Sequence, residues 1–148
     1  GADLHDRMAL EGAKIICECI VQLKDGSAVA LPQNEKLVVE CTKFSKEDGR
    51  IDWTVPAENI HNKVRAYNPW PGSFCEMPAG GGVKIIKTQP VDVEGAPGEI
   101  VHVSKNELIV ACKSEGLRIL ELQPAGKKPM PVGNFLNGHN LQAGQKFI

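Results

Sequence analysis

The amino-acid sequence predicts a mainly β fold with flanking helices, and three observations lead to this prediction. Five short β-prone runs occupy the second half of the chain, and turns that contain glycine separate them. Two stretches upstream place apolar residues three or four positions apart, which is the period of an amphipathic helix. The 148 residues, 42% hydrophobic and 24% charged, have the composition of a globular protein and suffice for one domain with an appendage.

The first helix is expected from Leu4 to Leu23, with Asp3 as its N-cap. The pattern stops at the turn signal of residues 24–27. A lone helix cannot bury an apolar stripe, so we expect this one to pack on a partner that the next residues do not supply. The apolar residues that fall near one face are Leu4, Met8, Ile15, Ile16, Cys19, Ile20 and Leu23.

Residues 25–42 are predicted to be a linker, because they contain Gly26, Pro32, Gln33 and Asn34 and only one short β-prone run, at 37–39. A polar, turn-like stretch follows.

The second helix is expected from Pro56 to Tyr67. Thr54 is predicted to cap it, and Pro56 suits the first turn because a proline there loses no intrahelical hydrogen bond. Asn68-Pro69 ends the pattern, since the residue before a proline avoids the helical region.

The five strand candidates lie after Pro71-Gly72, and a single helical turn is expected near 131–137. Five short strands at this spacing fit a small closed or half-closed β-barrel of the oligonucleotide-binding (OB) kind. Gly80-Gly81-Gly82 is predicted to be a hairpin turn and not a phosphate loop, because it has no lysine and opens no helix. The strand candidates are Ser73–Met77, Val83–Thr88, Gly98–Val103, Leu108–Cys112 and Leu117–Leu122.

The five cysteines and four histidines show no metal-ligand spacing and no nucleophile pattern. The odd cysteine number without a C-x-x-C pair predicts an intracellular protein with reduced, mostly buried thiols. No apolar run has the length of a membrane span, and no signal peptide is recognisable. A start at Gly1 without methionine suggests a processed or truncated N-terminus.

The formal net charge is −1, so the whole chain has no basic field. Residues 1–56 hold ten acids and seven Lys/Arg (−3), whereas residues 57–148 hold eight acids and ten Lys/Arg (+2). Two basic groups stand out: Lys127 and Lys128 in a turn after the last strand, and Lys43, Lys46 and Arg50 further upstream. From the residues alone, either group could grip phosphates or form an ordinary solvated surface.

The run from Tyr67 to Gly72 combines aromatic residues with prolines, directly after Arg65. Tyr67 and Trp70 could stack on nucleic-acid bases, but packing in a core is the favoured expectation for Trp70 and also for Trp53. The residues alone thus predict a soluble barrel module that could bind an anionic polymer.

Six segments carry a family resemblance, in order and in spacing, over nearly the whole chain. Arg50–Trp53 reads R-I-D-W and Val64–Gly72 reads V-R-A-Y-N-P-W-P-G. Leu120–Met130 reads L-E-L-Q-P-A-G-K-K-P-M, and F-L-N-G-H begins at Phe135 with Gly144 beyond it. Upstream stand L-H-D-R-M with Gly12, and K-F-S-K-E from Lys43. These segments resemble the C-terminal part of methionyl-tRNA formyltransferases, which carry I-D-W, I-R-A-[FL]-N-P-W-P-G and L-Q-P-x-G-K-K-x-M.

The resemblance implies a function that the residues alone did not. Enzymes of this family transfer a formyl group from 10-formyltetrahydrofolate, their co-substrate, to the amino group of initiator methionyl-tRNA in bacterial-type translation. Their chemistry belongs to an N-terminal Rossmann-like domain, in which an Asn, a His and an Asp act next to an S-x-L-P motif. These catalytic positions are expected to lie upstream of Gly1, outside this sequence. His61 and Asn62 do not replace them. We therefore expect this chain alone to lack catalysis and to bind no cofactor, no metal and no membrane.

The resemblance also implies a division of the chain. Residues 1–24 are expected to be the terminal helix left over from the missing catalytic domain, residues 25–42 the linker, and residues 43–148 a C-terminal OB-like tRNA-binding domain. The cytoplasm of a bacterium is the expected location, with an organellar matrix as the alternative.

The implied tRNA-binding residues are Lys43, Lys46, Lys127 and Lys128, which fit basic positions of the family, and Arg65, which lies in one of its motifs. The expected partners are initiator methionyl-tRNA and the missing catalytic domain. Two other functions stay open: a freestanding OB-like nucleic-acid-binding module, and the C-terminal domain of a related enzyme that uses formyl-folate. The Gln123–Met130 segment argues against the second, because it resembles the tRNA enzymes specifically.

Overall fold

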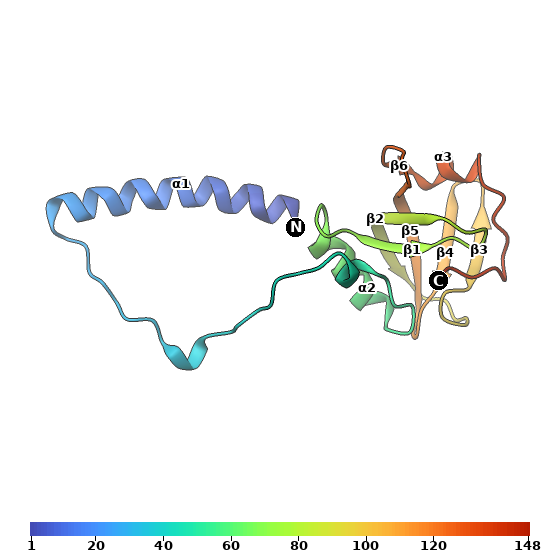
Figure 1. The fold of residues 1–148 in the computed structure, drawn as a ribbon, viewed down its shortest axis with the longest axis horizontal. Helices are drawn as coiled ribbons and strands as arrows, with labels where there is room; N and C mark the ends of the chain where they lie inside the picture. The colour runs from blue at the N-terminus through green and yellow to red at the C-terminus, as the bar shows by residue number, and fades with distance from the viewer. The chain divides into compact units, whose positions relative to one another are not determined.

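The computed structural model describes residues 1–148, apart from the side chain of Ala2, and the chain forms two compact units, Gly1–Lys43 and Phe44–Ile148. The first unit contains helix α1, Ala2–Asp25, which ends at Gly26 with a left-handed φ of 78° (Figure 1). The predicted helix is confirmed, but the predicted cap is wrong. Gly1 is the N-cap and Asp3 lies inside the first turn, because the helix begins before it.

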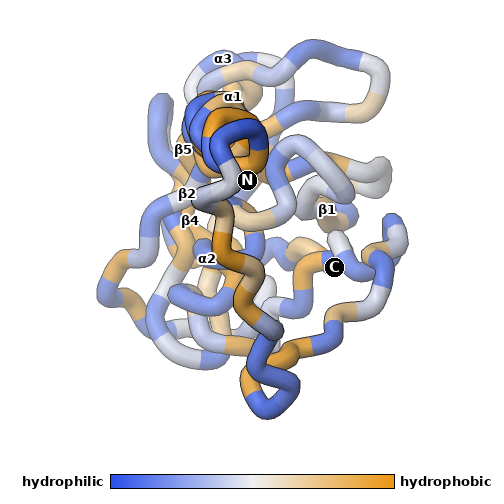
Figure 2. Tube along the Cα trace, turned by 90° about the vertical axis from the view of Figure 1, so that its left-hand side faces the viewer, coloured by the Kyte–Doolittle hydropathy of each residue, from blue (hydrophilic) through white to orange (hydrophobic). Residues whose placement is uncertain are grey.

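The apolar residues of α1 are solvent-exposed. Ile15 and Ile16 are each 57% exposed and Leu23 is 70% exposed. Hydrophobic and hydrophilic residues both occur around the coil of this helix (Figure 2). The helix therefore forms with an apolar surface that the structure does not bury.

The segment after α1 contains one 3₁₀ turn, η1, Glu35–Leu37, where the side chain of Asn34 accepts a hydrogen bond from the Lys36 N–H at 3.1 Å. The β-prone run predicted at 37–39 is not a strand. Leu37 completes the 3₁₀ turn, and Val39 is 89% exposed. A strand requires a neighbour to satisfy its backbone groups, and this run pairs with none in the described chain.

The second unit is mainly β, as predicted, with one antiparallel sheet in the order β1-β2-β5-β4-β3 and β6 paired to β5 (Figure 1). All five strand candidates are confirmed with small shifts of their ends, and the short sixth strand was missed. The hairpin turn predicted at Gly80-Gly81-Gly82 joins β1 to β2. The strands are β1 Ser73–Glu76, β2 Gly82–Val91, β3 Ile100–Ser104, β4 Glu107–Ala111, β5 Gly116–Pro124 and β6 Met130–Pro131.

The C-terminal tail connects the two ends of this strand order. Ile148 exchanges two backbone hydrogen bonds with Glu76 of β1, at 2.7 and 3.0 Å, and the Phe147 N–H donates to the carbonyl of Gly98, just before β3, at 2.9 Å. The tail thereby covers backbone groups at both sheet edges and gives the unit a barrel-like form.

Helix α2, Ala57–Tyr67, packs its buried residues Ala57, Ile60 and Val64 mainly over β2. The helix was predicted, but its cap was not. Pro56 takes the N-cap position, while the Thr54 hydroxyl donates to Asp52 Oδ1 at 2.6 Å. The short elements η2, Glu47–Gly49, and α3, Val132–Leu136, flank the sheet.

The core of the second unit confirms one aromatic prediction and contradicts another. Trp53 is 5% exposed, with its ring 6.1 Å from the Phe147 ring. Trp70, expected to pack, is 62% exposed, because it lies in the turn between α2 and β1. The largest fully buried side chains include Phe135, Ile60, Ile100, Leu108, Leu117, Ile119 and Leu122.

The expectation of mostly buried thiols is wrong for three of the five cysteines. Cys75 and Cys112 are buried in the second unit, whereas Cys17, Cys19 and Cys41 are exposed in the first. The difference follows from the two units, because only the second has a packed core.

Candidate nucleic-acid interface

A groove of about 640 Å³ lies on the outside of the sheet, between the β1–β2 hairpin and the end of β5. This volume is within the range of sites that hold a small molecule or one nucleotide. Pro71 and Pro124 contribute apolar walls, and Lys46 from the segment before the sheet contributes a cation. The groove is thus built by three separate parts of the second unit.

Three outward-facing residues form a row across its floor. The strand register pairs Phe74 with Lys84 and Lys84 with Gln123, so these residues are direct neighbours on β1, β2 and β5. Successive residues of a strand alternate faces, and the adjacent residues Cys75 and Val83 are buried on the inner face. An aromatic ring, an ammonium group and an amide therefore stand side by side on one surface.

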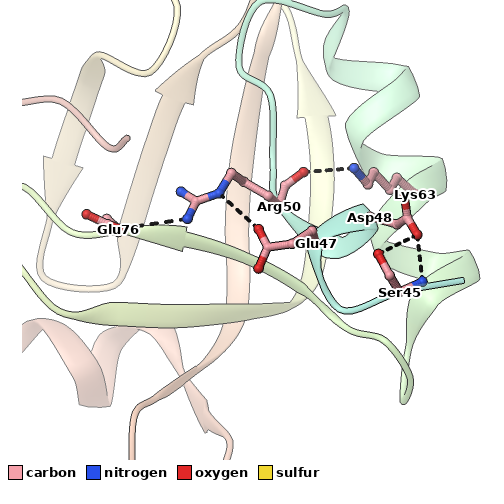
Figure 3. Close-up of polar contacts among 6 residues, drawn as sticks. All are labelled: Ser45, Glu47, Asp48, Arg50, Lys63 and Glu76. Carbon is pink, nitrogen blue, oxygen red and sulfur yellow. Dashed lines mark hydrogen bonds and ion pairs between the residues drawn. The ribbon is translucent and has the colours of Figure 1, made fainter.

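Arg50 extends this row by one position. It forms a parallel bridge with Phe74, and its guanidinium carbon lies 5.4 Å from the centroid of the Phe74 ring. The guanidinium also contacts two carboxylates, with 3.8 Å from Nη2 to Glu76 and 3.8 Å from Nε to Glu47 (Figure 3). Glu76 lines the groove, and its ion pair with Arg50 offsets the negative charge that it brings there.

Lys46 and Lys84 are the ammonium groups that line the groove. Within the part of the chain that the structure describes, neither forms an ion pair, so their charges are available to an anion. Exposed lysines act as mobile point charges that suit phosphate oxygens.

The turn that carries Lys46 is fixed by polar contacts (Figure 3). Asp48 accepts hydrogen bonds from the N–H of Ser45 at 2.6 Å and from its hydroxyl at 2.9 Å, and these bonds lower the pKa of Asp48. Lys63 of α2 donates to the carbonyl of Arg50 at 2.8 Å. Partial burial lowers the pKa of Lys63, and the nearby charge of Asp48 opposes this shift.

Two glycines shape the surroundings of the groove. A Cβ at Gly49 would collide with the carbonyl oxygen of Gly72, so the turn after Lys46 can lie against this backbone only without a side chain. At Gly82, beside Glu76 on the outer face, a Cβ would meet nothing within 4 Å. The first glycine permits close packing, whereas the second leaves the groove open.

The structure brings three of the five predicted tRNA-binding residues to this region. Lys46 lines the groove, and the turn with Lys127 and Lys128 follows directly after its β5 wall. The Gln123 side-chain amide donates to the Lys127 carbonyl at 2.7 Å and holds that turn beside the strand.

The other two predicted residues lie elsewhere. Arg65 is exposed in the last turn of α2, where its Nη1 donates to Asn62 Oδ1 at 3.3 Å, and it does not line the groove. Lys43 is exposed and is the last residue of the first unit.

Lys84 was missed by sequence reasoning. The alternation Val83-Lys84-Ile85 places Lys84 on the outer face of a half-buried strand, and this signal was available. Its neighbours Phe74 and Gln123 depend on the register of three strands, which the alternation does not specify.

His61 and Asn62 make local contacts on α2. His61 Nδ1 lies 3.0 Å from the Thr88 hydroxyl, and the Asn62 amide donates to Glu58 at 3.1 Å. Among the described side chains, no group of three or more His, Cys, Asp or Glu could hold a metal ion. None of the described helices has the length and apolar character needed to cross a bilayer.

The sheet, its flanking helices and the cationic groove define a small, mainly β module appended to a separate helical segment. The chain belongs to the family described as "Formyl transferase, C-terminal domain", whose model matches residues 43–140.

Its relatives include two bacterial proteins named methionyl-tRNA formyltransferase. The protein from Chelativorans sp. (strain BNC1) is 39% identical over 97% of this chain and 46% of its own length. The protein from Paraburkholderia xenovorans (strain LB400) is 40% identical over 99% of this chain and 45% of its own length. The chain thus spans less than half the length of these relatives.

A similar fold occurs in the crystal structure of HypX from Aquifex aeolicus in complex with tetrahydrofolic acid. The TM-score is 0.62 at 19% sequence identity, over 89% of this chain and 26% of HypX. At this identity the likeness concerns the fold alone.

Proposed function

We propose that this chain is the tRNA-binding C-terminal part of a methionyl-tRNA formyltransferase. The observation that carries the proposal is that Lys46 lines a groove of the second unit and that the Lys127–Lys128 turn follows directly after the β5 wall of the same groove. The name of the relatives, methionyl-tRNA formyltransferase, supports methionyl-tRNA as the nucleic acid.

In the whole protein, a formyl group moves from 10-formyltetrahydrofolate to the amino group of initiator methionyl-tRNA, on a catalytic domain outside this chain. Residues 1–24 are the terminal helix of that domain, residues 25–42 the linker and residues 43–148 an OB-like tRNA-binding domain. The exposed apolar surface of α1 supports this division, because such a surface needs a partner to cover it. The proposed location is the bacterial cytoplasm.

In this proposal the lysines hold the tRNA backbone and do no chemistry. Lys46, Lys127 and Lys128 contact phosphates beside the groove, while Lys43 and Arg65 add contacts outside it. Phosphate contacts of this kind fix the position of an RNA without reading its sequence. With a net charge of −1, the chain has no overall field to assist, so the affinity depends on these local groups and falls steeply with salt.

The proposal is tested by binding of this chain to initiator methionyl-tRNA across a salt series, beside the double variant Lys127→Ala/Lys128→Ala. A plot of log affinity against log salt has a negative slope. We expect this slope to be shallower by about 1.8 in the variant, since each lost phosphate contact accounts for roughly 0.9 on a duplex.

The matched control is Lys105→Ala/Lys113→Ala, which removes two exposed lysines on the far side of the sheet order, near β3 and β4. This control should leave the slope unchanged. The proposal is wrong if the chain does not bind tRNA even at low salt, or if both double variants change the slope equally.

A further inference from the structure

We propose that the groove takes one unpaired nucleotide whose base carries an exocyclic amino group. The base stacks on Phe74, Gln123 reads its edge, and Lys46 and Lys84 hold its phosphates. This inference rests on the proposed function, in that the ligand belongs to a tRNA.

The stacking surface is the Phe74 ring, which lies on the outer face of β1 and lines the groove. The Arg50 guanidinium lies over this ring, 5.4 Å from its centroid, and adds positive charge next to it. Aromatic rings and guanidinium planes are the groups on which proteins stack unpaired bases. Pro71 and Pro124 line the same groove and complete its apolar walls.

The direction of the Gln123 amide gives the groove its selectivity. Its nitrogen donates to the Lys127 carbonyl at 2.7 Å, and because a carbonyl only accepts, the amide nitrogen must be the atom on that side. The Oε1 atom therefore faces away from the turn, and no donor in the described chain bonds to it. An acceptor at this position matches the exocyclic amino group of adenine or cytosine. Uracil has no amino group and could offer only its ring N3–H, so its binding is expected to be weaker and not absent.

The phosphates are held by the two lysines of the groove. Lys84 stands between Phe74 and Gln123 in the cross-strand row, and Lys46 lines the opening from the turn before the sheet. The one carboxylate among the lining residues, Glu76, is paired with Arg50. The balance of charge in the groove, two lysines unpaired in the described chain and one paired carboxylate, thus favours an anionic ligand.

A double helix does not fit this arrangement. The groove of about 640 Å³ is the size of a small-molecule site, and a duplex keeps its bases stacked inside the helix. Unpaired nucleotides can turn a base outward onto an aromatic side chain. The chemistry therefore selects a loop, a bulge or a free end over a paired stem.

The test measures binding of the full chain to short oligoadenylate, oligocytidylate and oligouridylate, and to a duplex of equal length. Gly82→Leu fills the groove, and it should fold normally because its Cβ meets nothing within 4 Å and its φ is not in the left-handed region. We expect Gly82→Leu and Phe74→Ala each to weaken oligoadenylate binding by about five-fold to a hundred-fold, as expected for loss of one stacked base. Lys84→Ala should also weaken it.

The matched control is Lys87→Ala, which removes the same charge from an exposed position on the same strand outside the groove. It should change the affinity less than Lys84→Ala does. Oligoadenylate and oligocytidylate should bind about two-fold to ten-fold more tightly than oligouridylate, as for one neutral hydrogen bond. Gln123→Ala should remove this preference. Circular dichroism verifies that each variant is folded.

The outcomes separate this inference from the proposed function. If tRNA binds and Lys127→Ala/Lys128→Ala weakens it, but Gly82→Leu and Phe74→Ala bind oligoadenylate like the parent chain, the inference is wrong and the proposed function stands. Equal affinity for single strands and duplex would also overturn it. An equal affinity for uridylate and adenylate would overturn the role of Gln123. If the chain binds neither tRNA nor oligonucleotides, both proposals are wrong.

Discussion

Helices α1 and α2 are both amphipathic, yet they differ in what their apolar residues contact. Ile60 and Val64 of α2 are each only 1% exposed, because this face of the helix packs against the sheet of the second unit. Ile16 and Ile20 of α1 are 57% and 56% exposed. Apolar residues that recur with a period of about 3.6 thus specify a helix and the face that it can bury. Whether this face is buried depends on the presence of a partner.

The same difference separates the cysteines of the two units. Only the second unit has the packed interior in which a thiol loses water.

The largest contrast is expected in thiol reactivity. Burial raises the pKa of the Cys75 and Cys112 thiols to about 12, so at pH 8 a fraction of roughly 10⁻⁴ is thiolate, compared with about a quarter for an ordinary thiol. In a disulfide-exchange assay on the native chain, Cys17, Cys19 and Cys41 should react at least about 10³-fold faster than the buried pair. Mass spectrometry of the labelled peptides identifies the sites. Fast labelling of all five in the native chain would contradict the packed interior.

The next contrast compares one substitution on the two helices. Ile60→Ala should lower the free energy of unfolding of the second unit by about 2–5 kcal/mol, because it removes buried methyl groups and leaves a cavity. Ile16→Ala removes the same atoms from an exposed position and should change it by less than about 0.5 kcal/mol. Urea unfolding followed by the fluorescence of Trp53, which is buried in this core, measures both. Equal losses would mean that α1 contributes to the stability of the second unit.

The smallest effect concerns the turn that carries Lys46. Hydrogen bonds from Ser45 lower the folded-state pKa of Asp48 below its ordinary value of 3.8. The ionised carboxylate therefore stabilises the fold above about pH 3.8, and this contribution is lost as the pH falls through the lowered pKa. Asp48→Ala should be slightly less stable than the parent at neutral pH, and the difference should shrink in acid. Asp92→Ala, which removes a carboxylate that makes no hydrogen bond in the described chain, serves as the control.

Local patterns were enough to predict the elements of this protein. β-prone runs separated by glycine-containing turns located all five main strands, and helical periodicity located α1 and α2 to within a few residues. Errors concentrated at ends and turns. Asp3 and Thr54 were expected to cap helices that begin at other residues, and Trp70 was expected to pack but lies exposed in a turn. These positions depend on how a segment meets its neighbours, which local periodicity does not contain.

The candidate site was predictable only in part. The Lys127–Lys128 turn and Lys46 were chosen from their sequence context and a family resemblance. In the structure Lys46 lines the groove, and the turn follows the end of β5 that forms one of its walls. Lys84 was not chosen, because a lysine on the polar side of a strand resembles any solvated residue. Its significance arises from its neighbours on β1 and β5.

The sequence by itself determined which segments are strands and helices, which faces are apolar, and which family the chain resembles, because these depend on spacing along the chain. Tertiary structure alone decided the sheet order, the register that aligns Phe74, Lys84 and Gln123, and the tail of residues 145–148 that covers both edges. It also decided which apolar face is buried. The physical reason is the same for each. Strand pairing and burial join residues far apart in the chain, and their free energy depends on which surfaces meet.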